Sequence, residues 1–298
     1  MTLAKSRVGV IGLGQMGGGV AKNLLKAGWQ VYGFDLKEEA LERLKNFGGE
    51  PMPDISTLLE HSDIVLTSLE GKVCRKVMTG EILPRCRRGQ RFIDLSTIPC
   101  PLARQFAAQF AEKGCDFMDA PVSGGKWKAE DGTLRVFVGG ERTSFERHLE
   151  LFLAFGDPEK IVYCGEAGQG QAAKVVQQLT HRLPDMARME VMAFGLRTGL
   201  TLDVVMRALD VDPQSDDPYA RLYRALQDGN MDDISTVFAE WEYYLEEVRE
   251  RGFRMPMLEA LYAFCREAEK VTKDNVGRPM PSLWRELMTR SNHSSKDD

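Results

Sequence analysis

Short apolar runs alternate with amphipathic segments through the first half of the chain. The runs are rich in β-branched residues and predict strands, at residues 7–11, 30–34, 63–67, 91–95 and 115–119, and further along at 134–138 and 161–163. The segments between them carry apolar residues at helical spacing and predict helices, at residues 16–27, 37–46, 72–79 and 101–113. Strands that alternate with helices of this length indicate βαβ units and a mainly parallel sheet.

After about residue 165 the helical spacing continues and no convincing strand follows. Helices are predicted at residues 169–199, 201–210, 215–228, 235–251 and 256–272. Pro184 is expected to kink the first of these, because proline lacks an N–H and crowds the preceding turn. We therefore predict an α/β domain over residues 1–165, an all-helical domain over 166–290 that begins with a long helix, and a disordered polar tail at 291–298.

The composition narrows the class of protein. With 298 residues the chain can hold one large domain or two ordinary ones, and its 43% hydrophobic and 28% charged residues are typical of a soluble globular protein. A formal net charge of −5 argues against a nucleic-acid partner. No apolar run approaches the ~20 residues that span a bilayer, and the first strand begins too early for a signal sequence. We expect a cytoplasmic protein with no membrane partner.

The cysteines and histidines do not predict a metal site. The six cysteines are scattered without a CxxC pair, and each of the four histidines is isolated in the sequence. We interpret the cysteines as small hydrophobic residues in a reducing compartment.

A glycine-rich turn directly follows the first predicted strand and opens the first predicted helix. It has the pattern GxGxxG, in the residues Gly12, Leu13, Gly14, Gln15, Met16 and Gly17. Glycines there permit a tight turn and let the backbone approach a pyrophosphate at the helix N-terminus. Asp35 stands at the end of the second strand, where its carboxylate would bind an adenosine ribose and repel a 2′-phosphate. The turn predicts NAD as cofactor, with NADP as the alternative because Lys37 is close. The competing interpretation is a glycine turn with a capping aspartate.

A second loop, DAPVSGG at residues 119–125, follows the fifth predicted strand. Gly124 and Gly125 expose successive backbone N–H groups and Ser123 adds a hydroxyl, a combination that suits a carboxylate. The loop therefore predicts a site for a small carboxylate-bearing substrate. An ordinary turn of the same composition is the alternative.

Lys174 lies between small and apolar neighbours in the segment GQGQAAKVVQQL, residues 168–179. A side chain that extends from a helix start to solvent is the plain interpretation. The functional interpretation places the ammonium group in a cleft between the domains. Partial loss of hydration there would lower its pKa towards neutral pH and suit it to general acid–base chemistry.

Four segments occur in the order and spacing of the β-hydroxyacid dehydrogenase family: IGLGQMGGGVAKNLLKAG at residues 11–28, DLST at 94–97, DAPVSGG at 119–125 and GQGQAAK at 168–174. The chain resembles this family, which includes 3-hydroxyisobutyrate dehydrogenases and tartronate semialdehyde reductases, over roughly residues 7–272. The resemblance implies a Rossmann-like N-terminal domain and an all-α C-terminal domain, joined by a long interdomain helix. It also implies NAD(P)-dependent interconversion of a small β-hydroxy acid and its semialdehyde or keto form, in a homodimer or homotetramer.

The resemblance also assigns roles to matching positions. The glycine turn at residues 12–17 would hold the pyrophosphate, and Leu69 and Thr97 would lie beside the adenosine ribose or the nicotinamide. The substrate carboxylate would be held by Ser123, Gly124 and Gly125. Lys174 would be the catalytic acid–base residue.

The chain departs from the family pattern in its second half. Gln177 and Gln178 stand where the family has two asparagines, so Gln178 keeps a catalytic amide one turn beyond Lys174 but extends it by one methylene. Ala239-Glu240 stands where relatives carry a Lys-Asp pair that helps to hold the cofactor. These changes leave two alternatives open: an imine-reductase-like enzyme, and a cofactor-binding or scaffold protein that has lost turnover.

Overall fold

The computed structural model describes residues 6–228 and 240–271, with side chains of the last helix as far as residue 266. The chain forms two compact units, unit 1 (Met1–Val176) and unit 2 (Gln177–Asp298). Unit 1 extends past the predicted limit at residue 165, because it contains the first turns of the long helix α9 (Gln169–Arg197). The predicted tail at 291–298 and the first part of the helix predicted at 235–251 lie outside the described residues.

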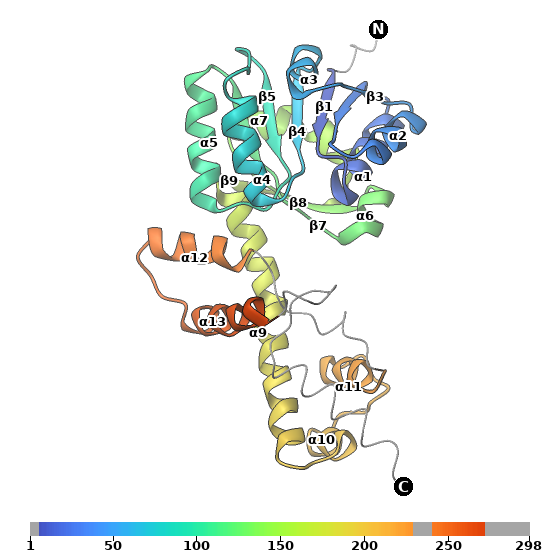
Figure 1. Cartoon of the computed structure of the whole chain (residues 1–298), viewed down its shortest axis with the longest axis vertical. Coiled ribbons are helices and arrows are strands. Elements are labelled where there is room, and N and C mark those ends of the chain that lie inside the picture. Colours follow the sequence, from blue (N-terminus) through green and yellow to red (C-terminus); the bar gives the residue numbers. More distant parts are fainter. Residues whose placement is uncertain (1–5, 229–239, 272–298) are drawn as a thin grey trace. The chain divides into compact units, whose positions relative to one another are not determined.

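Within its described residues, unit 1 is built on one nine-stranded sheet with the order β3-β2-β1-β4-β5-β6-β8-β7, and β9 pairs with β8 (Figure 1). The strands from β3 to β6 are parallel, and β8 runs antiparallel to β6 and β7. Their bounds are β1 Val8–Ile11, β2 Val31–Phe34, β3 Glu50–Pro51, β4 Ile64–Thr67, β5 Arg91–Asp94, β6 Asp116–Asp119, β7 Val122–Ser123, β8 Leu134–Gly139 and β9 Gly156–Gly165. The predicted mainly parallel sheet is confirmed. The two-residue strands β3 and β7 were not predicted, since two residues carry no readable alternation.

The parallel strands end level with one another. Ile11 pairs with both Phe34 and Thr67, and Asp94 pairs with both Thr67 and Asp119. The loops that follow β1, β2, β4, β5 and β6 therefore begin along one edge of the sheet. In open α/β sheets this carboxyl edge is where ligands bind.

Helices cover both faces of the sheet, because successive strand residues point to opposite sides. Ile64 and Leu66 pack with α1 (Gln15–Lys26) and α2 (Glu38–Asn46) in one core cluster, to which α6 (Gly125–Asp131) also contributes. Val65, between them, packs on the other face with α3 (Ile55–His61), α4 (Gly71–Val77) and α5 (Cys100–Glu112). A short π-helix (Met78–Ile82) continues α4. Apolar side chains on both faces explain why the strands read as continuous apolar runs.

Four helices of unit 1 were not predicted. They are α3, α6, α7 (Arg142–Arg147) and α8 (Leu149–Leu153). Each spans two turns or fewer, so its periodic pattern is too short to be recognised.

The described residues of unit 2 form helices joined by turns, without a strand among them. After α9 come α10 (Leu202–Ala208), α11 (Pro218–Asp228), α12 (Trp241–Glu250) and α13 (Pro256–Val271). The predicted all-α second region is confirmed. Tyr223 on α11 donates to Asp203 on α10 at 2.6 Å, and Trp241 is buried against Tyr244. Pro184 lies inside α9, which is helical on both sides of it, and its kink stays a prediction.

Candidate active site

Two glycines of the GxGxxG turn are required by contacts within the protein. Gly12 has φ +90°, and a Cβ there would lie 2.3 Å from the Ser68 carbonyl oxygen. A Cβ on Gly17 would lie 1.9 Å from the Gly12 oxygen, so Gly17 lets α1 pack against the turn. Gly14 is different, because a Cβ there would meet no protein atom within 4 Å. The missing side chain at Gly14 leaves open space outside the protein surface.

That open space lies at the N-terminus of α1. Gly14 is the N-cap residue of the helix and provides no side-chain cap, and the first turn contains no acidic residue. Uncapped N–H groups at a helix N-terminus favour an anion. The turn therefore fits a cofactor pyrophosphate, and Gln15 and Met16 occupy the first turn beside it.

Asp35 lies directly after β2 and holds the glycine turn. Its Oδ2 accepts a hydrogen bond from the Leu13 N–H at 2.7 Å, and its Oδ1 accepts one from the Lys37 N–H at 2.9 Å. The carboxylate is thus placed at the carboxyl edge, next to the turn. Its bond to a ribose stays a prediction.

Leu69 and Thr97 follow the next two strands, β4 and β5. The Leu69 N–H donates to Ser96 Oγ at 3.0 Å, which joins the two loops. Asp94, which is fully buried, accepts from Thr67 Oγ1 at 2.7 Å and from the Ser96 N–H at 3.1 Å. Burial raises the pKa of Asp94 above its usual range. The sequence reasoning did not single out this aspartate as a support for the loops.

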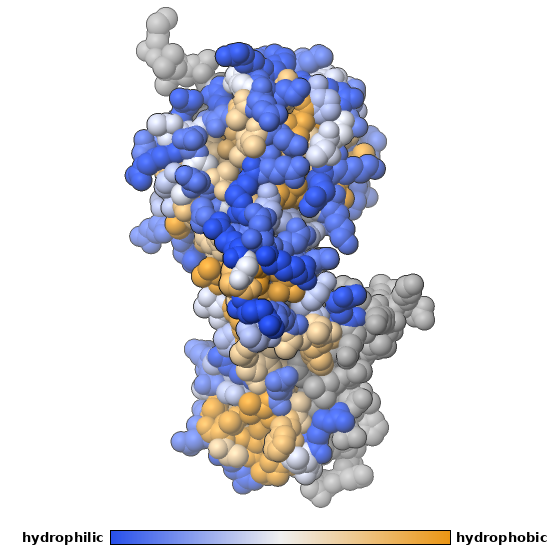
Figure 2. Space-filling model, turned by 90° about the vertical axis from the view of Figure 1, so that its left-hand side faces the viewer, coloured by the Kyte–Doolittle hydropathy of each residue, from blue (hydrophilic) through white to orange (hydrophobic). Residues whose placement is uncertain are grey.

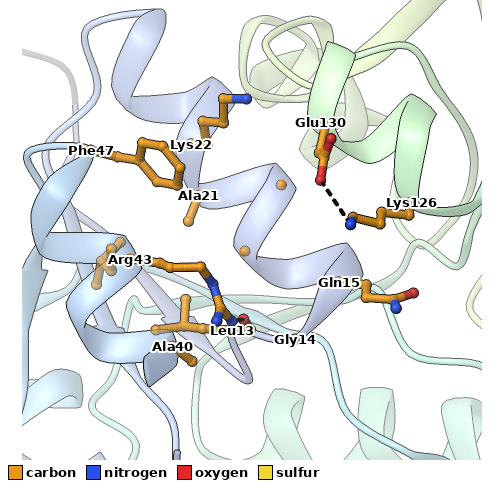
Figure 3. Close-up of a pocket in the computed structure, with 13 residues that line it drawn as sticks. Leu13, Gly14, Gln15, Ala21, Lys22, Ala40, Arg43, Phe47, Lys126 and Glu130 are labelled. Atoms are coloured by element: carbon orange, nitrogen blue, oxygen red, sulfur yellow. Dashed lines mark hydrogen bonds and ion pairs between the residues drawn. The ribbon is translucent and has the colours of Figure 1, made fainter. Parts of the chain in front are cut away.

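A pocket of about 350 Å³ lies beside the glycine turn and runs along α1 (Figure 3). Its charged side chains are Lys22 on α1, Arg43 on α2, and Lys126 and Glu130 on α6. Lys126 lies 3.8 Å from Glu130, and Arg43 makes a long bond of 3.5 Å to the Leu13 carbonyl. The cations outnumber the single carboxylate in this lining. The sequence reasoning did not identify the pocket, because its residues come from three separate helices.

The DAPVSGG loop leads from β6 through β7 into α6. Gly124 and Gly125 have φ values of +145° and +70°, which glycine adopts far more readily than other residues. A Cβ on Gly124 would touch the Lys128 side chain at 2.8 Å, whereas a Cβ on Gly125 would meet nothing within 4 Å. Ser123 is half-buried in β7. The loop thus leaves open space beside Gly125.

Lys174 is buried and belongs to the same unit as this loop. Only 6% of the residue is exposed, and its Nζ donates to the Val122 carbonyl at 3.0 Å. Val122 directly precedes Ser123, so the structure brings the lysine and the predicted carboxylate loop together. Gln178 belongs to unit 2, where its side-chain oxygen accepts a hydrogen bond from the Tyr244 hydroxyl.

Two further residues, missed by the sequence reasoning, connect the loops to α9. Asp119 accepts hydrogen bonds from the N–H groups of Gly168 and Gln171. The Gln171 side chain donates to the Ser96 carbonyl at 2.9 Å and accepts from the Ile98 N–H at 3.2 Å. Asp119 lies in the segment DAPVSGG and Gln171 in GQGQAAK, two segments that match the family, so these matches were the signal that could have identified both residues.

In the part of the chain that the structure describes, metal-ligating side chains do not gather in one place and the helices are too polar or too short for a bilayer. No group of three or more His, Cys, Asp or Glu side chains there is placed to hold a metal ion. No helix in those ranges is long and apolar enough to cross a bilayer. Ala239 lies outside the described residues, and Glu240 precedes α12 as its N-cap.

Sheet, turn and acid together define a class of protein. A parallel sheet whose first strand leads through a glycine turn into a helix, with an acid after the second strand, is the dinucleotide-binding domain of nicotinamide-dependent enzymes. Residues 7–165 match the family model described as the NAD binding domain of 6-phosphogluconate dehydrogenase.

Named relatives narrow this class. Mouse mitochondrial 3-hydroxyisobutyrate dehydrogenase is 33% identical over 211 residues, which are 70% of this chain and 62% of the mouse protein. The 3-hydroxyisobutyrate dehydrogenase of Mycobacterium tuberculosis, in its structure with L-serine, is 26% identical with a TM-score of 0.73, over 96% of this chain and 99% of that one. The chain belongs to the β-hydroxyacid dehydrogenase family. It spans less than two thirds of the length of the mouse relative.

The fold is shared more widely than the family. An imine reductase variant from Myxococcus stipitatus, in complex with NAD+, has a TM-score of 0.63 over 97% of this chain and 99% of its own. Its identity to this chain is 18%, which shows a common fold and nothing finer.

Proposed function

We propose that the protein is an NAD(P)-dependent dehydrogenase that interconverts a small β-hydroxy acid and its semialdehyde or keto form. The observation that carries this proposal is the bond of 3.0 Å from Lys174 Nζ to the Val122 carbonyl, because Ser123 comes next in the chain. A buried ammonium group beside a loop that suits a carboxylate fits a substrate that carries both a carboxylate and a reacting oxygen.

The bound cofactor would supply hydride exchange with the substrate carbon. Lys174 would hold the proton that leaves or joins the substrate oxygen, and its charge would stabilise negative charge on that oxygen. Ser123 and the N–H groups of Gly124 and Gly125 would bind the carboxylate and fix the orientation of the substrate.

NAD is the proposed cofactor in preference to NADP. Asp35 already accepts bonds from the Leu13 and Lys37 N–H groups, but a carboxylate offers about four acceptor positions, so a ribose hydroxyl can still be bound. The same charge would repel a 2′-phosphate. Lys22 and Arg43 in the neighbouring pocket are positively charged and would attract a 2′-phosphate, so the preference for NAD over NADP should be moderate.

Gln178 is proposed to select the substrate. Its amide lies one helical turn after Lys174 and is longer by one methylene than the asparagine of the family pattern. A longer amide would leave less space for the reacting end of a substrate and favour a smaller or differently shaped compound.

The direct test is a panel of small hydroxy acids, aldehydes and cyclic imines, with the absorbance of reduced cofactor as the readout. Turnover of at least one compound, abolished by Lys174→Met, is the expected result. Turnover of cyclic imines alone would favour the imine-reductase-like alternative. Cofactor binding without turnover of any compound would favour the scaffold alternative.

A homodimer or homotetramer is proposed for the assembly. Val191, Phe194 and Leu200 in unit 2 are 43%, 73% and 44% exposed, and Figure 2 shows a hydrophobic surface on this unit. A second copy of the chain would bury such side chains. Sedimentation of the purified protein at several concentrations tests this, and a monomer at all of them would contradict it. The cytoplasmic location likewise stays a prediction.

A further inference from the structure

A buried carboxylate joins the end of β6 to the beginning of α9. Asp119 is 0% exposed; its Oδ1 accepts from the Gly168 N–H at 2.7 Å and its Oδ2 from the Gln171 N–H at 2.8 Å. Both N–H groups belong to the start of the helix, where backbone donors lack partners within the helix. Asp119 therefore caps α9 from another element of the fold.

The surrounding backbone fixes where this first turn lies. A Cβ on Gly170 would lie 2.4 Å from the Phe137 carbonyl and 2.7 Å from the Asp119 carbonyl. A Cβ on Gly139 would lie 2.6 Å from Asp119 Oδ1 and 2.7 Å from the Gly170 nitrogen. Glycine on both sides thus lets the helix approach the strands closely enough for the carboxylate to bond.

The same short segment that holds the helix start also contacts Lys174. Lys174 follows Gln171 by three positions, so the two residues share one face of α9. The Lys174 Nζ bonds to Val122, which follows Asp119 by three positions. The beginning of α9 is therefore held at two points, by Asp119 through its backbone and by Val122 through the Lys174 side chain, and Val122 immediately precedes Ser123.

We propose that Asp119 is a positioning residue, which sets the place of Lys174 relative to the Ser123 loop by holding the first turn of α9. This inference rests on the proposed function, in which Lys174 handles the proton. A displacement of about 1 Å in a catalytic group can lower a rate by about 10²-fold. A side chain that acts through the helix can therefore control the rate without touching the substrate.

Asp119→Asn tests this role with almost no change of shape. The amide keeps one acceptor oxygen but turns an NH2 group towards an N–H donor, so one of the two bonds is lost. Asp54→Asn is the matched control, because Asp54 accepts from the Thr57 N–H at 2.7 Å and caps α3 in the same unit. We expect kcat of D119N to fall about 10- to 100-fold, with dissociation constants for NAD(H) unchanged within about twofold. D54N should keep kcat.

Two readouts separate positioning from a general structural role. The pH profile of kcat should shift in D119N and not in D54N, because the surroundings of the proton-handling group change. In a Lys174→Met background, D119N should cause no further loss, since its effect passes through the lysine. Equal losses in both backgrounds, an unchanged kcat in D119N, or a matching loss in D54N would each overturn the inference.

Two additions keep the test decisive. If D119N does not fold, Gly170→Ala keeps the carboxylate but wedges the first turn away, and it should reduce kcat in the same way. If the wild type turns over no compound, two other measurements replace kcat. One is the pH dependence of Lys174 acylation, and the other is the rate of hydrogen exchange at the Gly168 and Gln171 amides. Faster exchange and altered acylation in D119N would then support the positioning role although the proposed function had failed. Unchanged exchange and acylation would reject it.

Discussion

Two loops at the carboxyl edge of one sheet are held in opposite ways. The glycine turn after β1 is fixed by its own close contacts and by Asp35, a half-buried acid one strand away. The loop after β6 begins at the fully buried Asp119, and this residue also holds the start of α9. The first loop offers open space at Gly14, and the second provides the Val122 carbonyl that binds the Lys174 ammonium group of α9. The proposed cofactor binding thus depends on the local shape of the backbone, whereas the proposed chemistry depends on contacts between distant segments.

Substitution of Lys174 should give the largest difference between the two loops, because it lowers turnover and leaves cofactor affinity unchanged. Lys174→Met removes the proposed proton carrier and should raise the barrier by roughly 3–5 kcal/mol, while cofactor affinity survives. Arginine should not rescue, because its charge is permanent and its shape differs. Single-turnover rates and cofactor titration measure the two effects. Lys113→Met, at an exposed position after α5, is the control. Normal turnover of K174M would leave the lysine as a structural side chain.

Alanine substitutions at Gly17 and Gly14 should distinguish two roles of the glycine turn, in protein stability and in cofactor binding. Gly17→Ala places a Cβ 1.9 Å from a carbonyl oxygen, so we expect the free energy of unfolding to fall by about 1–3 kcal/mol or more. Gly14→Ala meets no protein atom and should leave stability nearly unchanged while weakening NAD(H) binding. Thermal unfolding and cofactor titration of both variants check this. Equal cofactor affinity in G14A and the wild type would show that the open space is not the pyrophosphate site.

Asp35→Ser addresses the choice between cofactors. Loss of the carboxylate should narrow the preference for NAD over NADP by about tenfold, the size of one charge-assisted bond of ~1.4 kcal/mol. The ratio of the two dissociation constants is the measurement, because damage to the Leu13 contact weakens both cofactors alike. Tighter binding of NADP(H) by the wild type would contradict the preference itself.

The charge of Asp119 should make stability depend on pH. Burial raises its pKa from 3.8 to about 7, with the buried Asp94 adding to the shift, while the Gly168 and Gln171 N–H groups oppose it. Between these values the folded state holds a proton that the unfolded state has lost, so this contribution to stability falls as pH rises from about 4 to about 7. The advantage of wild type over Asp119→Asn in free energy of unfolding should shrink over that range. A constant difference in denaturant titrations would refute this.

Gln178→Asn should have the smallest effect. Shortening the amide restores the family's residue and should raise kcat/KM for 3-hydroxyisobutyrate or tartronate semialdehyde by a few-fold. This lies below the ~10-fold or more that one methylene is worth in an enclosed pocket, because Gln178 is only half-buried. Gln177→Asn is the matched control. A loss of activity on every compound would exclude a role in specificity.

Local signals explain why the glycine turn was predictable. Residues 12–17 follow a strand and open a helix, and Asp35 comes at the expected number of positions later in the sequence. The residues that form the sequence pattern therefore also contact one another in the structure. The sheet was likewise readable, because its strands are continuous apolar runs. The roles of Asp119 and Gln171 depend on partners 49 to 75 positions away, which no local pattern encodes. Lys174 was noticed through its apolar neighbours, but its contact with Val122 required the fold.

The level ends of the parallel strands have an evolutionary consequence. Because β1, β4, β5 and β6 stop in matched register, each loop begins from a common line that the sheet core alone determines. An insertion, deletion or exchange in one loop can therefore occur without shifting the strand beside it. Selection can revise the compound that the protein recognises while inheriting the scaffold intact. Related chains can in this way diverge in chemistry faster than they diverge in architecture.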